Sequence, residues 1–164
     1  MRVFLGFGSN KGNRLSYLNR ACKLIDECDE IEILKCSSVY ETEPWGFSNQ
    51  NMFLNAIAEA ETSLEPGVLL KKLKSIEKAL ERSANVKWAE REIDIDLLFY
   101  GDQIIESEGL SIPHKQIENR NFVLIPLVEL EPEFMHPVIK RTVHELLKIS
   151  PDKLKVHKTE HKLY

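Results

Sequence analysis

The chain has 164 residues, a length typical of one domain whose core needs no disulfide or metal to hold it together. Apolar residues make up 43% of the sequence and charged residues 29%, as in ordinary soluble globular proteins. The formal net charge is -4, whereas domains that bind nucleic acid are usually basic. We therefore expect a single domain over residues 1–164 that binds small molecules and no nucleic acid.

Cysteine usage and hydropathy narrow the expected cellular location. Cys22, Cys28 and Cys36 are odd in number and contain no CxxC pair, which argues against a disulfide framework and a zinc knuckle. The apolar run at residues 3–7 is too short for a signal peptide, and no run approaches membrane-spanning length. These features predict a cytoplasmic protein without a membrane partner, and the lack of an extra apolar stripe favours a monomer.

Hydrophobic periodicity predicts alternating strands and helices along the first part of the chain. In order, we expect a strand at 2–8, a helix at about 14–28, strands at 31–42 and 52–62, a helix at about 66–82 and a strand at 93–100. The order β-α-β-β-α-β is that of a ferredoxin-like split βαβ unit. The expected fold class is therefore α+β, with an antiparallel sheet flanked by helices in three αβα layers.

The remaining segments are loops and shorter elements. Residues 44–51 and 83–91 are expected to be loops, because Pro, Gly, Asn or broken periodicity interrupt the pattern there. Further on we expect short strands around Ile104 and Leu110, helices near 119–130 and 142–149, and a weakly ordered, solvated tail at 151–164.

Two carboxylates stand inside the apolar strand at 93–100. Asp94 and Asp96 alternate with apolar residues, so both point to one face of the strand, roughly 6.6 Å apart along it. Burying two like charges together is unfavourable unless a cation lies between them. The preceding residues include Arg82, Lys87 and Arg91, and cations beside a carboxylate pair are what a magnesium–phosphate site requires. A solvated strand end with two exposed acids is the alternative.

Two further groups of residues could bind a ligand. Trp45, Phe53 and Phe122 are aromatic residues in or near loops, and Asn55 interrupts an apolar strand. A buried amide needs hydrogen-bond partners, and a planar heterocycle would supply both these and a stacking face. Core packing is the default interpretation for the two phenylalanines. His114 and Arg120 could add cationic donors, although their order in the sequence does not show that they converge. The glycine-bearing start "GFGSNKG" fits no phosphate-binding motif and is interpreted as a tight turn.

These motifs together resemble the 6-hydroxymethyl-7,8-dihydropterin pyrophosphokinases of folate biosynthesis. The resemblance runs through "GFGSN", "SSVYETEPWG", "FLNA", "KWAEREIDIDLL", "IPH" and "NRNFVLIPL". It implies transfer of the β,γ-diphosphate of ATP to the hydroxymethyl group of the pterin, with release of AMP. It also implies two Mg²⁺ ions and ATP as co-substrate.

The same resemblance implies a role for each matching position. The catalytic residues would be Arg82, Arg91, Asp94 and Asp96, with Asp94 and Asp96 as the metal ligands. The pterin would contact Thr42, Pro44, Trp45, Phe53, Asn55 and Phe122. ATP would contact Lys74, Glu77, Arg82, Lys87, Trp88, Arg91, Leu97, Ser111, His114, Lys115 and Arg120. Trp88 would belong to a loop that closes over the site.

Some positions depart from the family pattern. The common "RWGPR" is "KWAER" here, and Ala84 and Gly109 stand where relatives usually carry a basic residue. Lys115 replaces a frequent aromatic residue after the histidine. These changes concern ATP affinity and loop behaviour, and they leave the carboxylate pair intact.

Three interpretations stay open from the sequence. The first is the pyrophosphokinase, and the second is another metal-dependent phosphoryl or nucleotidyl transferase on the same scaffold. The third is a binding module without catalysis, such as a nucleotide sensor or RNA binder. Phe53, Asn55 and Phe122 discriminate the first two, because only the acceptor pocket differs. The acidic net charge and the lack of a basic or aromatic sheet face weigh against RNA.

Overall fold

The computed structural model describes residues 1–45, 50–80 and 92–164. Its main sheet has six strands in the order β5-β1-β4-β3-β8, with β2 also pairing with β4. All of these pairings are antiparallel. The strands are β1 (Arg2–Ser9), β2 (Ile31–Cys36), β3 (Ser38–Thr42), β4 (Phe53–Thr62), β5 (Asp94–Tyr100) and β8 (Val156–Lys162).

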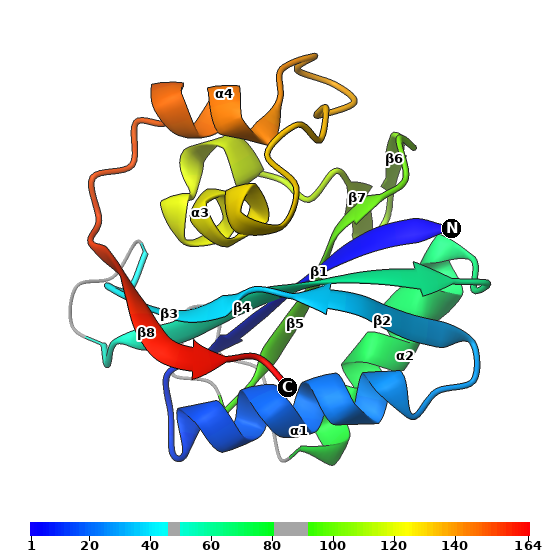
Figure 1. Cartoon of the computed structure of the whole chain (residues 1–164). Coiled ribbons are helices and arrows are strands. Elements are labelled where there is room, and N and C mark those ends of the chain that lie inside the picture. The colour runs from blue at the N-terminus through cyan, green and yellow to red at the C-terminus, as the bar shows by residue number, and fades with distance from the viewer. Residues whose placement is uncertain (46–49, 81–91) are drawn as a thin grey trace.

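Four α-helices in the described ranges cover the two faces of this sheet (Figure 1). They are α1 (Arg14–Asp26), α2 (Pro66–Ala79), α3 (Asn121–Leu130) and α4 (Val143–Ile149). The helices α1 and α2 share one hydrophobic core with the sheet, whereas α3 and α4 share a second core on its other face. The predicted α+β class with three αβα layers is confirmed.

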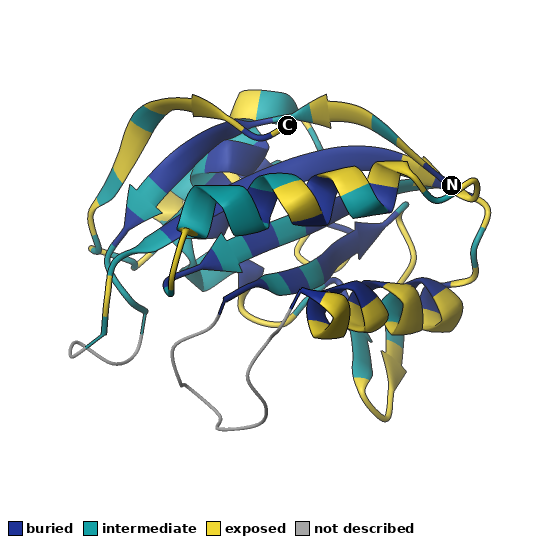
Figure 2. Ribbon diagram, turned by 90° about the horizontal axis from the view of Figure 1, so that it is seen from below, coloured by how far each residue is buried: buried dark blue, intermediate teal, exposed yellow. Residues whose placement is uncertain are grey.

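The helices form where the apolar spacing requires them. In α1, Leu18, Cys22 and Ile25 recur at helical spacing and are fully buried. Asn13 caps this helix, because its side chain accepts a hydrogen bond from the Ser16 amide at 3.1 Å. Figure 2 shows the resulting division of α1 and α2 into a buried side against the sheet and an exposed outer side.

A small hairpin follows the main sheet, near the two positions where short strands were expected. It consists of β6 (Ile105–Ser107) and β7 (Leu110–Ile112), which pair antiparallel. Gly109 closes the turn with φ +80°, a left-handed conformation that side chains rarely adopt. The turn therefore explains the glycine at this position. A 3₁₀ helix, η1 (Ile117–Asn119), precedes α3.

The strand expected over 31–42 is two strands, β2 and β3, which both pair with β4. Ser37 interrupts it: its amide donates to the Ile57 carbonyl at 2.9 Å, and its hydroxyl accepts from the Ile57 amide at 2.9 Å. The side chain thus replaces one ladder bond at the break. Alternation alone does not reveal such an exchange, because both halves keep a strand pattern.

The weakly ordered tail expected at 151–164 differs from the structure, which forms strand β8 at residues 156–162. This strand pairs with β3 and places Leu163 in the core, fully buried. The sequence concealed the strand because its other residues are mostly polar and exposed, as suits an edge strand. The last residues are held as well, since the Tyr164 amide donates to the Asn19 side chain of α1 at 3.1 Å.

Within the parts of the chain that the structure describes, each helix is too short or too polar to cross a lipid bilayer.

Candidate active site

A cavity lies between the end of the sheet and the first turn of α3, on the face that α3 and α4 cover. It is lined by Gly6, Phe7, Gly8, Thr42, Glu43, Trp45, Gln50, Phe53, Asn55, Ala56, Ile57, Asp94, Asp96, Leu98, Arg120, Phe122 and Val123. The cavity brings together eight of the residues predicted from the sequence. These are Thr42, Trp45, Phe53, Asn55, Asp94, Asp96, Arg120 and Phe122.

The register of three neighbouring strands sets the floor of this cavity. Gly8 on β1 pairs with Asn55 on β4 and with Asp94 on β5, so the three residues form one row across the sheet. The next row joins Ile57, Gly6 and Asp96 in the same order. Adjacent strands are about 4.8 Å apart, which puts the Asn55 and Asp94 backbones roughly 10 Å from each other.

Glycine is required in the middle of the first row. A Cβ atom at Gly8 would lie 3.0 Å from Oδ1 of Asn55, closer than real side chains normally allow. At Gly6 the nearest atom would be the flexible end of Leu98, at 3.3 Å. The glycines therefore leave the space above β1 open between the Asn55 amide and the aspartates. Interpreting "GFGSNKG" only as a tight turn missed this role, which depends on strand pairing.

One end of the cavity has the shape and polarity of a heterocycle site. Asn55 is 7% exposed, and its Nδ2 donates to Thr42 Oγ1 at 2.6 Å, which fixes the orientation of the amide. The Arg120 guanidinium lies over the Trp45 ring at 4.8 Å and over the Phe122 ring at 5.8 Å. The amide and these rings, with Phe53 on β4, provide stacking faces and an edge for hydrogen bonding.

The other end of the cavity carries the carboxylate pair. Asp94 and Asp96 both lie on the cavity face of β5, while Ile95 and Leu97 point into the core on the opposite face. Burial raises the pKa of Asp96, and the nearby Asp94 charge raises it further. His114, Lys74 and Arg120 oppose this rise but do not cancel it. Burial and the like charge of Asp94 thus make ionised Asp96 unfavourable unless a cation is close.

This charge distribution fits a hard divalent cation. Magnesium prefers carboxylate oxygens and commonly takes only one or two of them from the protein. Within the described ranges, no three His, Cys, Asp or Glu side chains are grouped so as to hold a metal by themselves. Two aspartates alone leave most coordination positions to water and phosphate oxygens, as in nucleotide-dependent transferases. Asp94 and Asp96 therefore fit magnesium together with a phosphorylated substrate.

His114 and Arg120 each have a buried nitrogen without a hydrogen-bond partner among the described residues. These nitrogens are Nδ1 of His114 and Nε of Arg120. Arg120 lines the same cavity as the two aspartates, and the His114 amide donates to the carbonyl of Leu98, two residues beyond Asp96 on β5, at 2.9 Å. Burial lowers the pKa of Arg120, while Asp96 and Asp94 raise it. Unpaired buried nitrogens are costly, and an anion such as a phosphate would satisfy them.

The predicted nucleotide residues on α2 lie behind β5. Lys74 Nζ donates to Glu77 Oε1 at 2.8 Å and to the Ile95 carbonyl at 3.2 Å, and it lies 3.8 Å from Asp94 Oδ1. Glu77 also accepts from the Ile95 amide at 2.7 Å. Burial raises the pKa of Glu77, whereas Lys74 lowers it. The backbone amide and carbonyl of Ile95, which stands between the two aspartates on β5, are therefore both hydrogen-bonded to α2.

Other predicted residues stand apart from the cavity lining or outside the described ranges. Leu97 is 3% exposed and belongs to the core under α1 and α2. Ser111 and Lys115 both bond to Glu106 of the β6–β7 hairpin, at 2.7 Å each. Pro44 precedes Trp45 at the cavity rim without lining it. Arg82, Lys87, Trp88 and Arg91 lie outside the described residues.

Several lining residues were not predicted from the sequence. Glu43 and Gln50 flank the loop after β3, and their residue types carry no signal of their own. Gly6 and Gly8 alternate with buried residues in β1, and this alternation was the available signal. The link between these glycines and the site appears only in the pairing of β1 with β4 and β5.

Comparison with known proteins shows the family of the chain. Residues 4–132 match the family model described as 7,8-dihydro-6-hydroxymethylpterin-pyrophosphokinase. The chain is 46% identical over 143 residues to the 2-amino-4-hydroxy-6-hydroxymethyldihydropteridine pyrophosphokinase of Aquifex aeolicus, covering 87% of this chain and 88% of that protein. It is 40% identical over 128 residues to the protein of that name from Bacillus subtilis, covering 78% of this chain and 77% of the relative.

A solved structure supports the fold. The wild-type HPPK-DHPS of Plasmodium falciparum with pteroate superposes with a TM-score of 0.73 over 90% of this chain, at 17% identity. This chain spans only 42% of that longer protein, so the likeness concerns the fold of one part. The family match and the two bacterial relatives carry the assignment. The chain belongs to the 7,8-dihydro-6-hydroxymethylpterin-pyrophosphokinase family.

Proposed function

We propose that this chain transfers the β,γ-diphosphate of ATP to the hydroxymethyl group of 6-hydroxymethyl-7,8-dihydropterin in folate biosynthesis, giving AMP and the pterin diphosphate. The observation that carries the proposal is the strand row Asn55–Gly8–Asp94. It joins an amide that can recognise a heterocycle to a carboxylate that can hold a metal, with open space between them. Family membership supplies the identity of the two substrates.

The pterin occupies the aromatic end of the cavity. Phe53 and Phe122 stack on the two faces of the ring, and Trp45 with Pro44 closes its side. Asn55 reads the hydrogen-bonding edge of the ring, and Thr42 holds the amide in the required orientation through the 2.6 Å bond. A reduced pterin offers several ring nitrogens and an amino group, which suits a site with a fixed amide.

ATP occupies the carboxylate end, with its phosphates between β5 and α3. His114 and Arg120 bind phosphate oxygens through nitrogens that have no hydrogen-bond partner among the described residues. Lys74 is already close to Asp94 and contributes a further positive charge. The nucleotide would also contact Glu77, Leu97, Ser111 and Lys115, as the family resemblance implies. Arg82, Lys87, Trp88 and Arg91 complete the phosphate side in this proposal.

Asp94 and Asp96 are the residues that would hold two magnesium ions together with the ATP phosphates. The burial of Asp96 on the same strand face as Asp94, which makes the ionised pair unfavourable without a cation, supports this assignment. When bound, magnesium would neutralise the phosphate oxygens and favour attack on phosphorus. The residues of the chain position the two substrates. Phe53 and Phe122 orient the pterin so that its hydroxymethyl oxygen faces ATP, and Lys74 and Arg120 hold the diphosphate in line with that oxygen.

The reaction is balanced without a further cofactor. The hydroxymethyl oxygen forms a bond to the β-phosphorus, and the bond from the β-phosphorus to the bridging oxygen of the α-phosphate breaks. AMP leaves with that oxygen and its electron pair, and the hydroxyl proton is released. In the described part of the site no side chain stands out as a general base.

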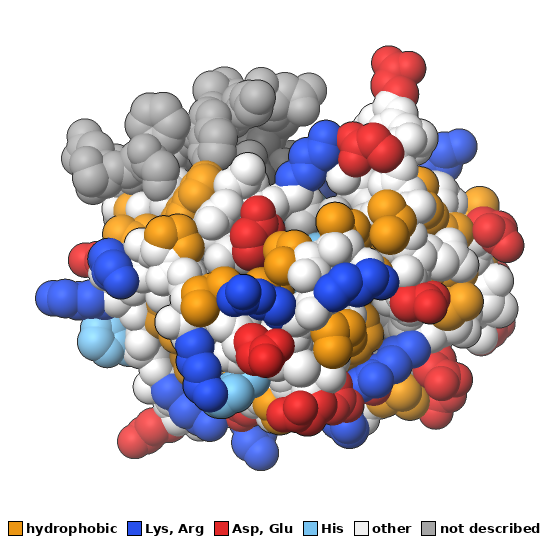
Figure 3. Space-filling view, turned by 90° about the horizontal axis from the view of Figure 1, so that it is seen from above, with side chains coloured by type: hydrophobic (Ala, Val, Ile, Leu, Met, Phe, Trp, Pro, Cys, Tyr) orange, Lys and Arg blue, Asp and Glu red, His pale blue; other side chains and the backbone are white. Residues whose placement is uncertain are grey.

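We further propose that the protein is a cytoplasmic monomer that binds no nucleic acid. The three cysteines are free, which suits a reducing compartment. On the face drawn in Figure 3, basic and acidic side chains are interspersed, which favours small anions over an extended nucleic acid. Sedimentation analysis with and without substrates tests the monomer.

Product analysis tests the proposed reaction. The purified chain is incubated with magnesium, ATP and the reduced pterin alcohol, and the nucleotides are separated by chromatography. We expect AMP and the pterin diphosphate in equal amounts. Formation of ADP would instead indicate transfer of a single phosphoryl group, and an absence of turnover would contradict the assignment.

A further inference from the structure

The C-terminal segment lies beyond residues 4–132 that match the family model, yet it contacts both walls of the proposed pterin site. Its contacts are concentrated in the short stretch from Asp152 to Lys155. One end of this stretch binds the start of α3, which carries Phe122. The other end binds Glu43, which lines the cavity beside Thr42.

The first contact replaces a missing helix cap. Arg120 is the N-cap residue of α3 and makes no side-chain capping bond, and the first turn has no acidic residue. Instead, the backbone amide of Asn121 donates a hydrogen bond to Asp152 Oδ2 at 2.8 Å. The side-chain Nδ2 of Asn121 donates to the backbone carbonyl of Asp152 at 3.1 Å. A carboxylate at this end of a helix also interacts favourably with the helix dipole.

The second contact joins the segment to the opposite wall. The Glu43 amide donates to the Lys155 carbonyl at 3.3 Å, and the Lys155 amide donates to Glu43 Oε2 at 2.9 Å. Asp152 Oδ1 accepts from the Leu154 amide at 2.9 Å, which holds the intervening turn in place. Residues 152–155 therefore form a continuous hydrogen-bonded connection between the two walls.

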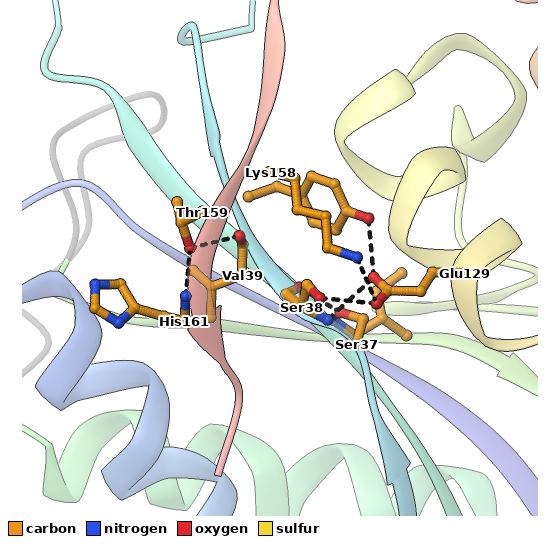
Figure 4. A network of polar contacts seen from close by, with 9 residues as sticks. Ser37, Ser38, Val39, Glu129, Lys158, Thr159 and His161 are labelled. Carbon is orange, nitrogen blue, oxygen red and sulfur yellow. Dashed lines mark hydrogen bonds and ion pairs between the residues drawn. The ribbon is translucent and has the colours of Figure 1, made fainter.

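A third set of contacts holds α3 farther along its length. Glu129 accepts hydrogen bonds from the Ser38 amide at 3.0 Å, the Ser38 hydroxyl at 2.8 Å and the Tyr40 hydroxyl at 2.8 Å. Lys158 of β8 lies 3.2 Å from the same carboxylate. Figure 4 shows how these side chains converge on Glu129 between α3, β3 and β8. The helix is thus held at both ends, and Asp152 provides the hydrogen bond to its first backbone amide at the cavity.

We propose that Asp152 is a positioning residue for the pterin, acting through the first turn of α3. It holds Arg120 and Phe122 at the distance from β3 and β4 that the flat ring requires. The inference rests on the proposed function, because it assigns the position of one wall of that same site. Removing the carboxylate weakens mainly pterin binding, and it affects ATP binding less because Arg120 is one of several groups proposed to bind the phosphates.

Steady-state kinetics of Asp152→Ala provide the main test. Loss of a charge-assisted bond corresponds to about a tenfold change, so the KM for the pterin should rise about five- to tenfold. The KM for ATP should rise less, by up to about twofold, because Arg120 is one of several groups proposed to bind the phosphates. Asp152→Asn retains one acceptor oxygen, so its pterin KM should lie between those of the wild type and the alanine variant.

Thr142→Ala is the matched control. Thr142 caps α4 through a hydrogen bond from the Glu145 amide at 3.2 Å, on an element outside the cavity. Its loss should lower the melting temperature to a similar extent and leave the pterin KM unchanged. Hydrogen exchange gives a readout that is independent of activity: the Asn121 amide should exchange about tenfold faster in Asp152→Ala.

The outcomes separate the two proposals. Wild-type enzyme that turns over the pterin, with an unchanged pterin KM in Asp152→Ala, overturns the positioning role and leaves the proposed function standing. A pterin KM that rises equally in Thr142→Ala also overturns it, because general destabilisation then explains the effect. Wild-type enzyme without pterin turnover overturns both proposals. A selective rise with partial rescue by Asp152→Asn supports the inference.

Discussion

The two ends of the cavity are prepared for their ligands in opposite ways. At the aromatic end, Asn55 is held by Thr42, and Arg120 is stacked between Trp45 and Phe122. At the carboxylate end, Asp94 and Asp96 share one strand face, and burial together with their mutual repulsion raises the pKa of Asp96. The amide and the rings of the aromatic end are therefore held in place by contacts within the protein, whereas the carboxylate end brings two like charges together.

This difference divides recognition from catalysis. A preorganised wall loses little conformational freedom on binding and so favours affinity and specificity for the acceptor. A site with unbalanced charge gains its stabilisation only when cations and phosphates arrive, which is when the reaction needs it. Variants at the two ends should consequently change different kinetic parameters.

The largest effect is expected at the carboxylate end. Asp96→Ala should lower kcat on the order of 10³-fold, because several kcal/mol of charge stabilisation are lost and each 1.36 kcal/mol is tenfold. Pterin binding, measured by calorimetry without nucleotide, should be nearly unchanged. Asp102→Ala, in an exposed turn after β5, is the control and should keep full activity. Wild-type turnover in Asp96→Ala would show that the metal assignment is wrong.

A smaller effect of another kind is expected at the aromatic end. Asn55→Ala removes a buried amide that contacts Thr42, and kcat/KM for the pterin should fall roughly 10- to 100-fold. The KM for ATP should stay within about twofold, since Asn55 lies on the row end opposite Asp94. Equal losses for both substrates would contradict the division between the two ends.

Gly8→Ala tests the open space between the ends. The new Cβ would lie 3.0 Å from Asn55 Oδ1, so the amide must shift by a few tenths of an ångström. We expect the pterin KM to rise about threefold to tenfold, because a small displacement weakens a fixed hydrogen bond. Gly67→Ala is the control: its Cβ would meet no atom within 4 Å. That control should be silent in kinetics and raise stability by about 0.5 to 1 kcal/mol.

The smallest effect concerns stability. Hydrogen bonds from Ser38, Tyr40 and Lys158 outweigh burial and lower the pKa of Glu129. A lowered folded-state pKa means that ionised Glu129 stabilises the fold above its unfolded pKa of about 4.3, and that this contribution is lost as the pH falls. Glu129→Gln should therefore be less stable than wild type by about 1 kcal/mol at neutral pH.

Urea unfolding across a pH series measures this contribution. The stability gap between wild type and Glu129→Gln should narrow as the pH falls below about 4.3. Lys155→Gln serves as the control for a general loss of charge, because the Lys155 side chain is exposed and lies in the C-terminal segment next to β8. If the difference in stability between wild type and Glu129→Gln stays constant at all pH values, the contribution of these hydrogen bonds does not depend on the charge of Glu129.

The sequence predicts those parts of the site that local patterns encode. Alternation with apolar residues placed Asp94 and Asp96 on one strand face, and an amide within an apolar strand singled out Asn55. The role of Gly8 was not predictable, because it depends on the register of β1 against two strands that are distant in sequence. Asp152 was missed for the same reason: it lies 31 positions from the helix end that it caps.

The same limit applied to the fold. Helical periodicity located α1 and α2 because their buried stripes are continuous along the sequence. Strand β8 is held by its edge pairing with β3, by the contact of Lys158 with Glu129 and by the buried Leu163 that follows it, and none of these leaves an amphipathic pattern. Strand pairing between segments distant in sequence therefore determines both the structure of residues 156–162 and the arrangement of the site.

The fate of the β-phosphorus tests the central claim most directly. ATP labelled with radioactive phosphorus at the β-position is incubated with magnesium, the reduced pterin alcohol and the wild-type chain, and the pterin product is isolated. A cavity that joins the pterin wall to the aspartate pair predicts that the label moves to the pterin and that the nucleotide product is unlabelled AMP. Label that remains entirely in the nucleotide, as ADP, would contradict the account.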